Sequence, residues 1–472
     1  MSGEPSSAWP RAGELALLVT VRFAADAVAW LSGFRALSDD DYSRIVIAEH
    51  FAQAPSFDPS GTSWLPLPFW VYGGALRVLG TTLDVARITA ACLGLLATIA
   101  LYAAARWLGA SRAGALLGAA LATLLEYSVL LGVATVPEVP CAALIALGAA
   151  ALASDDRSRR LLGGAALCAA CACRYEAWPV ALLFAGFTLR DAVTGRRELV
   201  PAALLALCFP LAWLCYGAFH HGSAFFFVTR VTAYRHALGG SAEPWWWRLF
   251  AYAWRGIFTP SMLLVIVTLL CTEVPSLKQR ALPQRPLLAA LALLGFLALG
   301  SLSESVPTHH AERALLPIGF LLTLLMGDRI LQAWPRARRS LRVGLVVSAG
   351  LVSVNGLSAA FDVESNARTD ELAIGAQARK SGATSLAIDT PDYGFFAVIA
   401  AFADPAHARA IDDRDPRNPT KPDPFASPEA LDGYLAAAKP PWLVVTHEHA
   451  ALVSARCSVR AGNAGFVLAR CP

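Results

Sequence analysis

Long apolar runs, separated by short polar segments, dominate the first 360 residues of the chain. Lipid offers no hydrogen-bond partner to a peptide group, so a helix that crosses a bilayer needs about 20 mostly apolar residues. The pattern predicts eleven spanning helices. They lie near residues 12–31, 86–105, 113–134, 139–153, 160–173, 177–189, 199–219, 250–272, 287–302, 314–328 and 343–360.

The apolar stretch 64–80 decides the topology, because counting it as a span would invert every later loop. It carries Pro66, Pro68, Gly73 and Gly74. With this stretch at the interface and the N-terminus inside, the inside segments contain 17 Lys and Arg in 63 residues, and the outside loops contain 8 in 104. Lys and Arg concentrate in cytoplasmic loops, so we predict this topology. The outside loops are then 32–85, 135–140, 174–176, 220–249 and 303–313.

Residues 361–472 have a different character, with Asp-Pro and Asn-Pro breakers between short apolar runs. The runs Ser385–Ile388, Trp442–Thr446 and Gly465–Leu468 predict strands, and the stretches between them predict helices at 368–380, 393–402 and 427–438. We expect a small α/β domain, outside the membrane on this topology. An oxidising exterior favours a disulfide between Cys457 and Cys471, with two free thiols as the alternative. The run His447-Glu448-His449 suggests a metal ligand set, but a surface loop explains it equally well.

The composition narrows the class of protein. Of the 472 residues, 56% are hydrophobic and 16% are charged, whereas soluble domains average roughly 45–50% and about 25%. The net charge of +4 is small. These values exclude a soluble enzyme and a disordered tail, and they predict no nucleic-acid partner. The first 360 residues form one membrane domain, and the chain is a multi-pass membrane protein.

Candidate chemistry lies in the first two outside loops. Asp39, Asp40 and Asp41 stand together just before an amphipathic helical pattern. One Asp suffices as a helix cap, and mutual repulsion among three tends to raise the pKa of at least one, which makes it a candidate general base. The second acid is Glu138, which stands rigidly between Pro137 and Pro140.

These features occur in an order that resembles a known family. The acidic cluster is followed by a Pro-containing apolar segment and by the stretch Gly80-Thr81-Thr82-Leu83-Asp84-Val85-Ala86-Arg87; Glu138 follows the third predicted span, and Arg313-Ala314-Leu315-Leu316-Pro317 comes late. The chain resembles the GT-C superfamily of membrane glycosyltransferases, in particular the group of protein O-mannosyltransferases and aminoarabinose transferases (glycosyltransferase family 39-like). The resemblance covers about residues 12–330.

The resemblance implies a hexosyl- or pentosyltransferase that uses a polyprenyl-phosphate sugar at the outer face of the membrane. Its acceptor is a hydroxyl of a glycan, a lipid or a protein. We expect Asp40, or else Asp41, to deprotonate that hydroxyl, with inversion at the anomeric carbon. Glu138 would orient the acceptor or, with Asp40, hold a divalent cation, which the resemblance leaves open. We expect the protein in the bacterial inner membrane, with its C-terminal domain extracytoplasmic.

The phosphate of the donor calls for cationic partners. Arg313 is the first candidate, because a guanidinium matches phosphate oxygens with two parallel hydrogen bonds. His309, His310, Arg87 and Arg174 are further candidates for donor binding. The alternative for Arg313 is an arginine that snorkels at a helix end.

Two other classes of protein stay open. A lipid or sugar transporter would place ionisable residues inside its spans, as Arg22, Asp26 and Glu126 are here. A non-catalytic membrane assembly protein would use the C-terminal domain to bind a partner.

Overall fold

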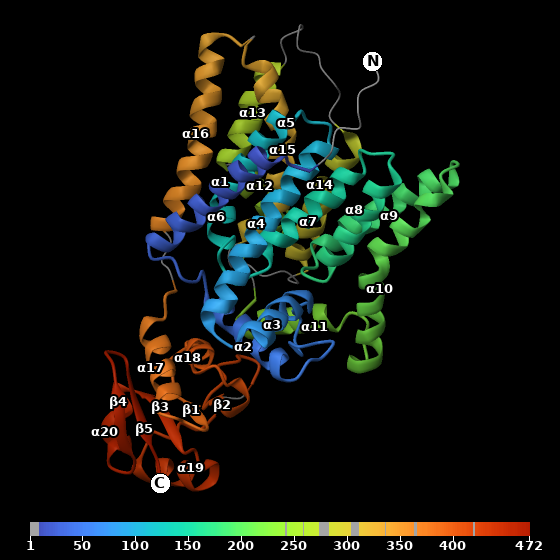
Figure 1. Cartoon of the computed structure of the whole chain (residues 1–472). Coiled ribbons are helices and arrows are strands. Elements are labelled where there is room, and N and C mark those ends of the chain that lie inside the picture. Colours follow the sequence, from blue (N-terminus) through green and yellow to red (C-terminus); the bar gives the residue numbers. More distant parts are fainter. Residues whose placement is uncertain are drawn as a thin grey trace. The chain divides into compact units, whose positions relative to one another are not determined.

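The computed structural model describes residues 9–240, 243–257, 259–272, 283–303, 311–335, 337–362, 366–418 and 421–472. It divides into two compact units. The first unit comprises Met1–Phe34, Gly61–Pro68 and Ala90–Val363, and the second comprises Arg35–Ser60, Phe69–Thr89 and Glu364–Pro472. Figure 1 shows the helices of the first unit and the orange-to-red C-terminal domain of the second.

The first unit is entirely helical among its described residues. Five helices are long and apolar enough to cross a membrane: Leu83–Trp107, Arg197–His221, Gln284–Leu302, Arg313–Ala333 and Arg339–Ala359. The helices of this unit are α1 (Ala12–Leu31), α4 (Leu83–Trp107, whose first turns belong to the second unit), α5 (Arg112–Thr123), α6 (Glu126–Leu131), α7 (Glu138–Ala151), α8 (Arg157–Cys171), α9 (Ala177–Val193), α10 (Val200–His221), α11 (Phe226–Ala237), α12 (Trp245–Ile257), α13 (Pro260–Thr272), α14 (Gln284–Leu302), α15 (Leu316–Ala333) and α16 (Arg339–Asp362). The chain is therefore a multi-pass helical membrane protein.

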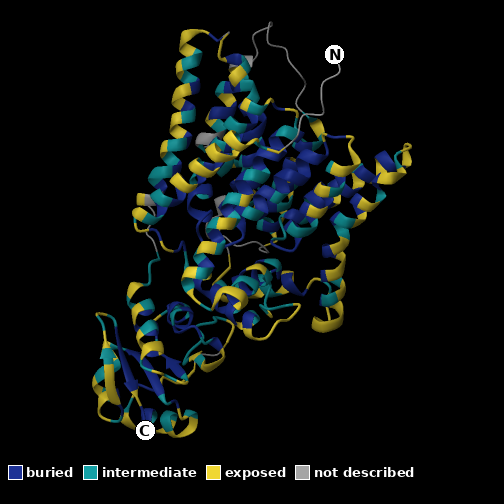
Figure 2. Cartoon of the chain, viewed as in Figure 1, coloured by how far each residue is buried: buried dark blue, intermediate teal, exposed yellow. Residues whose placement is uncertain are grey.

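Small residues let the central helices approach closely. A Cβ atom added to Gly327 of α15 would lie 2.3 Å from the carbonyl oxygen of Gly114 in α5. Such backbone contact is the usual basis of helix association in a membrane, where apolar side chains gain little by leaving lipid. Figure 2 shows the interior of the unit buried, whereas α16 exposes much of its surface.

Two predicted spans are interrupted in the structure. The stretch 113–134 divides into α5 and α6 at Leu124, because the backbone of α16 crosses there: a Cβ atom on Gly356 would lie 1.9 Å from the Leu124 carbonyl oxygen. The stretch 250–272 divides into α12 and α13, and α13 begins at Pro260, a residue that favours the first turn of a helix.

The ionisable residues inside the predicted spans are paired. Arg22 forms a buried ion pair with Asp26 on α1, and its Nη1 donates to the carbonyl oxygen of Ser128 in α6 at 2.9 Å. Glu126 accepts a hydrogen bond of 2.8 Å from Asn355 of α16. These contacts join α1 to α6 and α6 to α16.

The second unit combines part of the first predicted loop with the C-terminal domain. From the first loop come α2 (Asp39–Gln53) and most of α3 (Leu67–Leu79). The C-terminal domain consists of α17 (Thr369–Lys380), β1 (Leu386–Ile388), α18 (Phe395–Phe402), β2 (Ala408–Ala410), α19 (Pro428–Ala438), β3 (Trp442–Thr446), α20 (His447–Ser454), β4 (Ser458–Gly462) and β5 (Phe466–Arg470). Within this unit, α2 packs against α18.

The five strands form one mixed sheet in the order β2-β1-β3-β5-β4. Strand β1 is parallel to β2 and β3, and β5 is antiparallel to β3 and β4. Residues of α19 and α20 cover the face that presents Leu443, Val445 and Ala469. The inner strands β1, β3 and β5 are buried, whereas most residues of the edge strand β4 are exposed (Figure 2). Cys457 and Cys471 form a disulfide at the open end of the β4–β5 hairpin.

Candidate active site

Glu138 is the first residue of α7 and follows Pro137, which occupies the N-cap position of that helix. Its side chain is 4% exposed. The Oε1 atom accepts a hydrogen bond of 2.7 Å from Nη1 of Arg174, and Nη1 of Arg313 lies 3.8 Å from the same oxygen. One buried carboxylate therefore faces two guanidinium groups from distant parts of the sequence.

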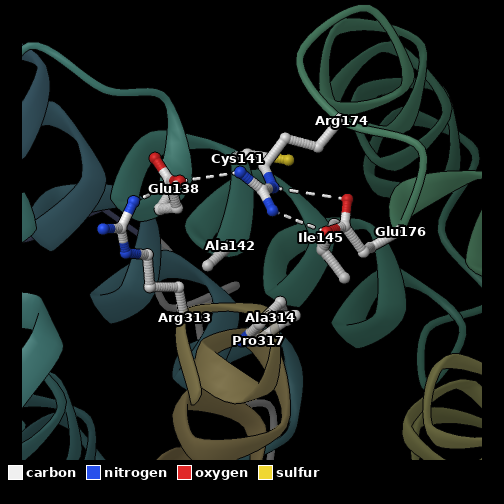
Figure 3. Close-up of a pocket in the computed structure, with 9 residues that line it drawn as sticks. All are labelled: Glu138, Cys141, Ala142, Ile145, Arg174, Glu176, Arg313, Ala314 and Pro317. Carbon is white, nitrogen blue, oxygen red and sulfur yellow. Dashed lines mark hydrogen bonds and ion pairs between the residues drawn. The ribbon is translucent and has the colours of Figure 1, made fainter. Parts of the chain in front are cut away.

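Arg174 lies in the short turn between α8 and α9 and has a carboxylate on each side (Figure 3). Besides its bond to Glu138, it donates from Nη2 to Oε1 of Glu176 at 2.6 Å and from Nε to Oε2 of Glu176 at 3.3 Å. Burial alone would lower the pKa of Arg174, but Glu176 and Glu138 outweigh it and raise the pKa above its ordinary value. The guanidinium is therefore charged at every physiological pH.

Arg313 lies in a 3-10 turn, Ala311–Leu315, directly before α15. Its side chain is 9% exposed, and its Nε atom is buried with no hydrogen-bond partner in the described part of the chain. The separation of 3.8 Å from Glu138 exceeds hydrogen-bond length. Arg313 therefore has donors available for a ligand, whereas those of Arg174 are engaged.

Together these residues form a small pocket in the first unit (Figure 3). Four charged side chains, Arg313, Glu138, Arg174 and Glu176, make a row of alternating sign. The remaining lining is small or apolar and comes from Cys141, Ala142, Ile145, Ala314 and Pro317.

The predicted acids of the first loop lie in the second unit, where they differ in their contacts. Asp39 is bound by Arg368, with Nε–Oδ1 2.9 Å and Nη2–Oδ2 2.8 Å. Asp41 caps α2, since its Oδ2 accepts from the backbone N–H groups of Leu37 and Ser38 at 3.2 and 3.3 Å. Asp40 is exposed, and its carboxylate has no hydrogen bond or ion pair within the described residues.

The other predicted residues are distributed as follows. Arg87 lies near the start of α4, in the second unit, and its buried Nη2 has no partner among the residues described. His309 and His310 lie outside the described residues. The structure thus brings Glu138, Arg174 and Arg313 together in the first unit, and Asp40, Asp41 and Arg87 belong to the second.

Two acidic residues at or near these sites were not among the sequence predictions. Glu176 has a signal in retrospect, because Arg174 and Glu176 form a charged turn between two short apolar helices. Glu49 of α2 is fully buried, and neither of its carboxylate oxygens has a hydrogen-bond partner within the described ranges. The sequence feature that could have revealed it is a Glu on the apolar face of an amphipathic helix, four residues after Ile45.

His449 lies in the first turn of α20, and its Nδ1 atom is hydrogen-bonded to Asp389 at 2.8 Å.

Metal ligation was left open by the sequence. Among the described residues, no group of three or more His, Cys, Asp or Glu side chains is arranged to hold an ion. His447-Glu448-His449 lies in the first turn of α20 rather than in a loop.

The fold matches solved membrane glycosyltransferases along nearly the whole chain. The structure of ArnT from Cupriavidus metallidurans bound to undecaprenyl phosphate aligns with a TM-score of 0.63 and 14% identity, covering 97% of each chain. The Archaeoglobus fulgidus oligosaccharyltransferase in complex with Zn and sulfate aligns with a TM-score of 0.53 and 13% identity, over 93% of this chain and 69% of that one. No protein-family model and no curated protein sequence matches the chain.

Both of these proteins have the GT-C fold. The resemblance predicted from the sequence is therefore confirmed at the level of the fold: this chain is similar to an aminoarabinose transferase and to an oligosaccharyltransferase.

Proposed function

We propose that the protein transfers a sugar, hexosyl or pentosyl, from a polyprenyl-phosphate donor to an acceptor hydroxyl at the outer face of the membrane. The observation that carries the proposal is the pocket in which Arg313 and Arg174 flank Glu138, in a chain with the GT-C fold. The ArnT structure holds undecaprenyl phosphate, a lipid of the same chemical class. A phosphate beside Arg313 would accept a hydrogen bond from its Nε–H group, which is buried and has no other partner in the described residues.

In this mechanism Asp40 accepts the proton of the acceptor hydroxyl. The acceptor oxygen attacks the anomeric carbon from the side opposite the phosphate, so the new glycosidic bond forms with inversion. The bond between the anomeric carbon and the phosphate oxygen breaks, and its electron pair stays on the polyprenyl phosphate. Arg313 and Arg174 stabilise that developing charge in a site with little water. Asp40 suits the role of base because its carboxylate is exposed and unoccupied within the described chain.

Glu138 has a different role in this proposal. Its contact of 2.7 Å with Arg174 and its approach to Arg313 place the two guanidinium groups for the phosphate. A divalent cation held by Asp40 and Glu138 is the alternative source of positive charge. We favour the arginines as the source of positive charge, because both guanidinium groups lie near the Glu138 carboxylate. Transfer that is unchanged by EDTA would support the arginines, and transfer that is lost and then restored by one metal would favour the cation.

The test uses the purified full chain in detergent, a panel of radiolabelled polyprenyl-phosphate sugars and a native membrane extract as the acceptor. We expect transfer by the wild type, loss of kcat in Asp40→Asn, and a higher donor KM in Arg313→Gln than in Arg313→Lys. Glu448→Gln, an exposed carboxylate of the C-terminal domain, is the matched control. Transfer that survives Asp40→Asn would move the base to Asp41 or Glu138. No transfer from any donor, with a known transferase active in the same mixture, would favour a transporter or an assembly protein.

A further inference from the structure

A short segment of the C-terminal domain, residues 366–368, is bound tightly to the loop that carries the aspartate triplet. Arg368 makes a bidentate ion pair with Asp39, and Asn366 donates from Nδ2 to the same carboxylate at 2.7 Å. The backbone joins as well, because Asn366 N–H donates to the Ala36 carbonyl at 3.0 Å. Tyr42 donates its hydroxyl to the carbonyl oxygens of Asn366 and Ala367, both at 3.0 Å. All of these residues belong to the second unit.

Arg368 is held in an unusual conformation. Its φ of +46° lies in the left-handed region, which costs a non-glycine residue roughly 1–3 kcal/mol. The guanidinium also donates to Glu371 at 3.0 Å and to Asp392 at 2.8 Å, so it binds three carboxylates at once. Gly394 leaves the space for this arrangement: a Cβ atom there would lie 2.8 Å from the Glu371 carboxylate and 3.1 Å from Nη1 of Arg368.

Both sequence neighbours of Asp40 are held in place: Asp39 by its ion pair with Arg368, and Asp41 by its hydrogen bonds at the start of α2. Arg368 binds Asp39, while the carboxylate of Asp41 holds the backbone N–H groups of Leu37 and Ser38. Asp40 lies between these two anchored residues with its own carboxylate exposed. The triplet therefore contains one residue that docks, one that caps and one that is free to react.

We propose that Arg368 is a positioning residue of the transfer reaction: by binding Asp39, it fixes the start of α2 and thereby the direction in which Asp40 presents its carboxylate. The inference rests on the proposed role of Asp40 as the base. Two parallel charge-assisted hydrogen bonds define an orientation as well as a distance. The pair is mostly shielded from water, with the side chains of Arg368 and Asp39 16% and 22% exposed. A misplacement of about 1 Å in a catalytic group can lower a rate roughly 100-fold.

The first test compares kinetic constants in the full chain. We expect Arg368→Gln and Asp39→Asn each to lower kcat by about 10- to 100-fold and to leave the donor KM within about twofold, because neither residue is in the arginine pocket. The double variant should lose no more kcat than Arg368→Gln alone, since Asp39→Asn removes a contact that Arg368→Gln has already removed. Arg368→Lys keeps the charge but not the bidentate geometry, so its kcat should lie between those of the wild type and Arg368→Gln. Arg456→Gln, which breaks the ion pair with Asp432 in the same domain, is the matched control and should keep wild-type kcat.

The second test does not depend on activity. Hydrogen–deuterium exchange of the backbone over residues 36–44 should be faster in Arg368→Gln and Asp39→Asn than in the wild type, and unchanged in Arg456→Gln. Faster exchange with lowered kcat supports the positioning role. Unchanged exchange, or faster exchange with unchanged kcat, overturns it. If the wild type transfers no sugar, the proposed function fails, and unchanged exchange would then reject the docking contact as well. Should Arg368→Gln not fold, Asp39→Asn decides alone, because it keeps the shape of the side chain.

Discussion

Glu49 makes the stability of the second unit depend on pH in a direction that is unusual for a carboxylate. The side chain is fully buried on α2, and its two oxygens lack hydrogen-bond partners in the described part of the chain. Burial raises the pKa of Glu49 from 4.5 to about 9, and the charge of Arg379 offsets only part of this rise. The carboxyl group is therefore protonated at neutral pH in the folded protein.

The sign follows from counting protons. The unfolded chain releases the Glu49 proton near pH 4.5, whereas the folded chain keeps it up to about pH 9. Between these values the folded state binds more protons, so the free energy of unfolding falls as pH rises. The slope is about 1.4 kcal/mol per pH unit. From pH 7 to pH 8.5 the unit should lose about 2 kcal/mol. This range also avoids His50, whose pKa is lowered by burial.

The assay is hydrogen–deuterium exchange of α2 in the full chain at pH 7, 7.5, 8 and 8.5, with each rate converted to a free energy of opening. We expect Glu49→Gln, which keeps the shape without the ionisable group, to remove about 2 kcal/mol of pH dependence. Glu448→Gln, in the same unit but exposed, should keep the wild-type slope. A flat wild-type profile, or a slope that persists in Glu49→Gln, would refute the reasoning, because the carboxyl group would then be ionised or hydrated in the folded state.

Three further predictions concern single contacts. Cys457→Ser opens a disulfide that closes a loop of 15 residues, and it should destabilise the C-terminal domain by about 3 kcal/mol in denaturant unfolding, a loss that reductant reproduces in the wild type and not in the variant. Gly327→Ala should destabilise the helix packing by about 1–3 kcal/mol through overpacking, and it should therefore lower the yield of monodisperse protein after detergent extraction. Gly350→Ala should not lower this yield, because a Cβ atom there would meet open space. Arg174→Gln leaves Glu138 and Glu176 without a shared cation and should cost about 3–5 kcal/mol of stability, measured as a lower Tm, together with sugar transfer; a wild-type Tm would show that the carboxylates are not charged.

The sequence predicted the elements whose limits are set locally. The first span, 12–31, coincides with α1, and the strand Trp442–Thr446 coincides with β3, since residues that end an apolar run stand on both sides: Arg11 and Ser32 for the span, and Pro441 and His447 for the strand. It did not show the interruption at Leu124, because that break results from the crossing of α16 more than 200 residues later. It also missed β4, an edge strand whose exposed residues carry no apolar alternation. The number of spans, the orientation and the outer location of the C-terminal domain stay predictions.

The candidate site divides in the same way. Residue type and loop position singled out Asp40, Glu138 and Arg313, because each is a charged residue in a segment predicted to lie outside the membrane. The partners of those residues are set by tertiary structure: Arg368 follows Asp39 by 329 positions, and Glu176 acts through Arg174 rather than on its own. A sequence pattern reveals an excess of acid over what a helix cap needs, but only the fold shows which of three adjacent carboxylates is left free.

That division of the triplet bears on how the reaction would be controlled. If Asp39 and Asp41 were absent, Asp40 would sit on a flexible loop, and its carboxylate would sample many directions at a cost in rate. With both neighbours bound, the entropy of the loop is lost during folding rather than in the transition state. The C-terminal domain then contributes to the reaction although its own residues need not contact the sugar. A chain truncated after residue 362 should therefore have no measurable kcat for transfer. The full chain with Asp39→Asn should have a lowered but measurable kcat.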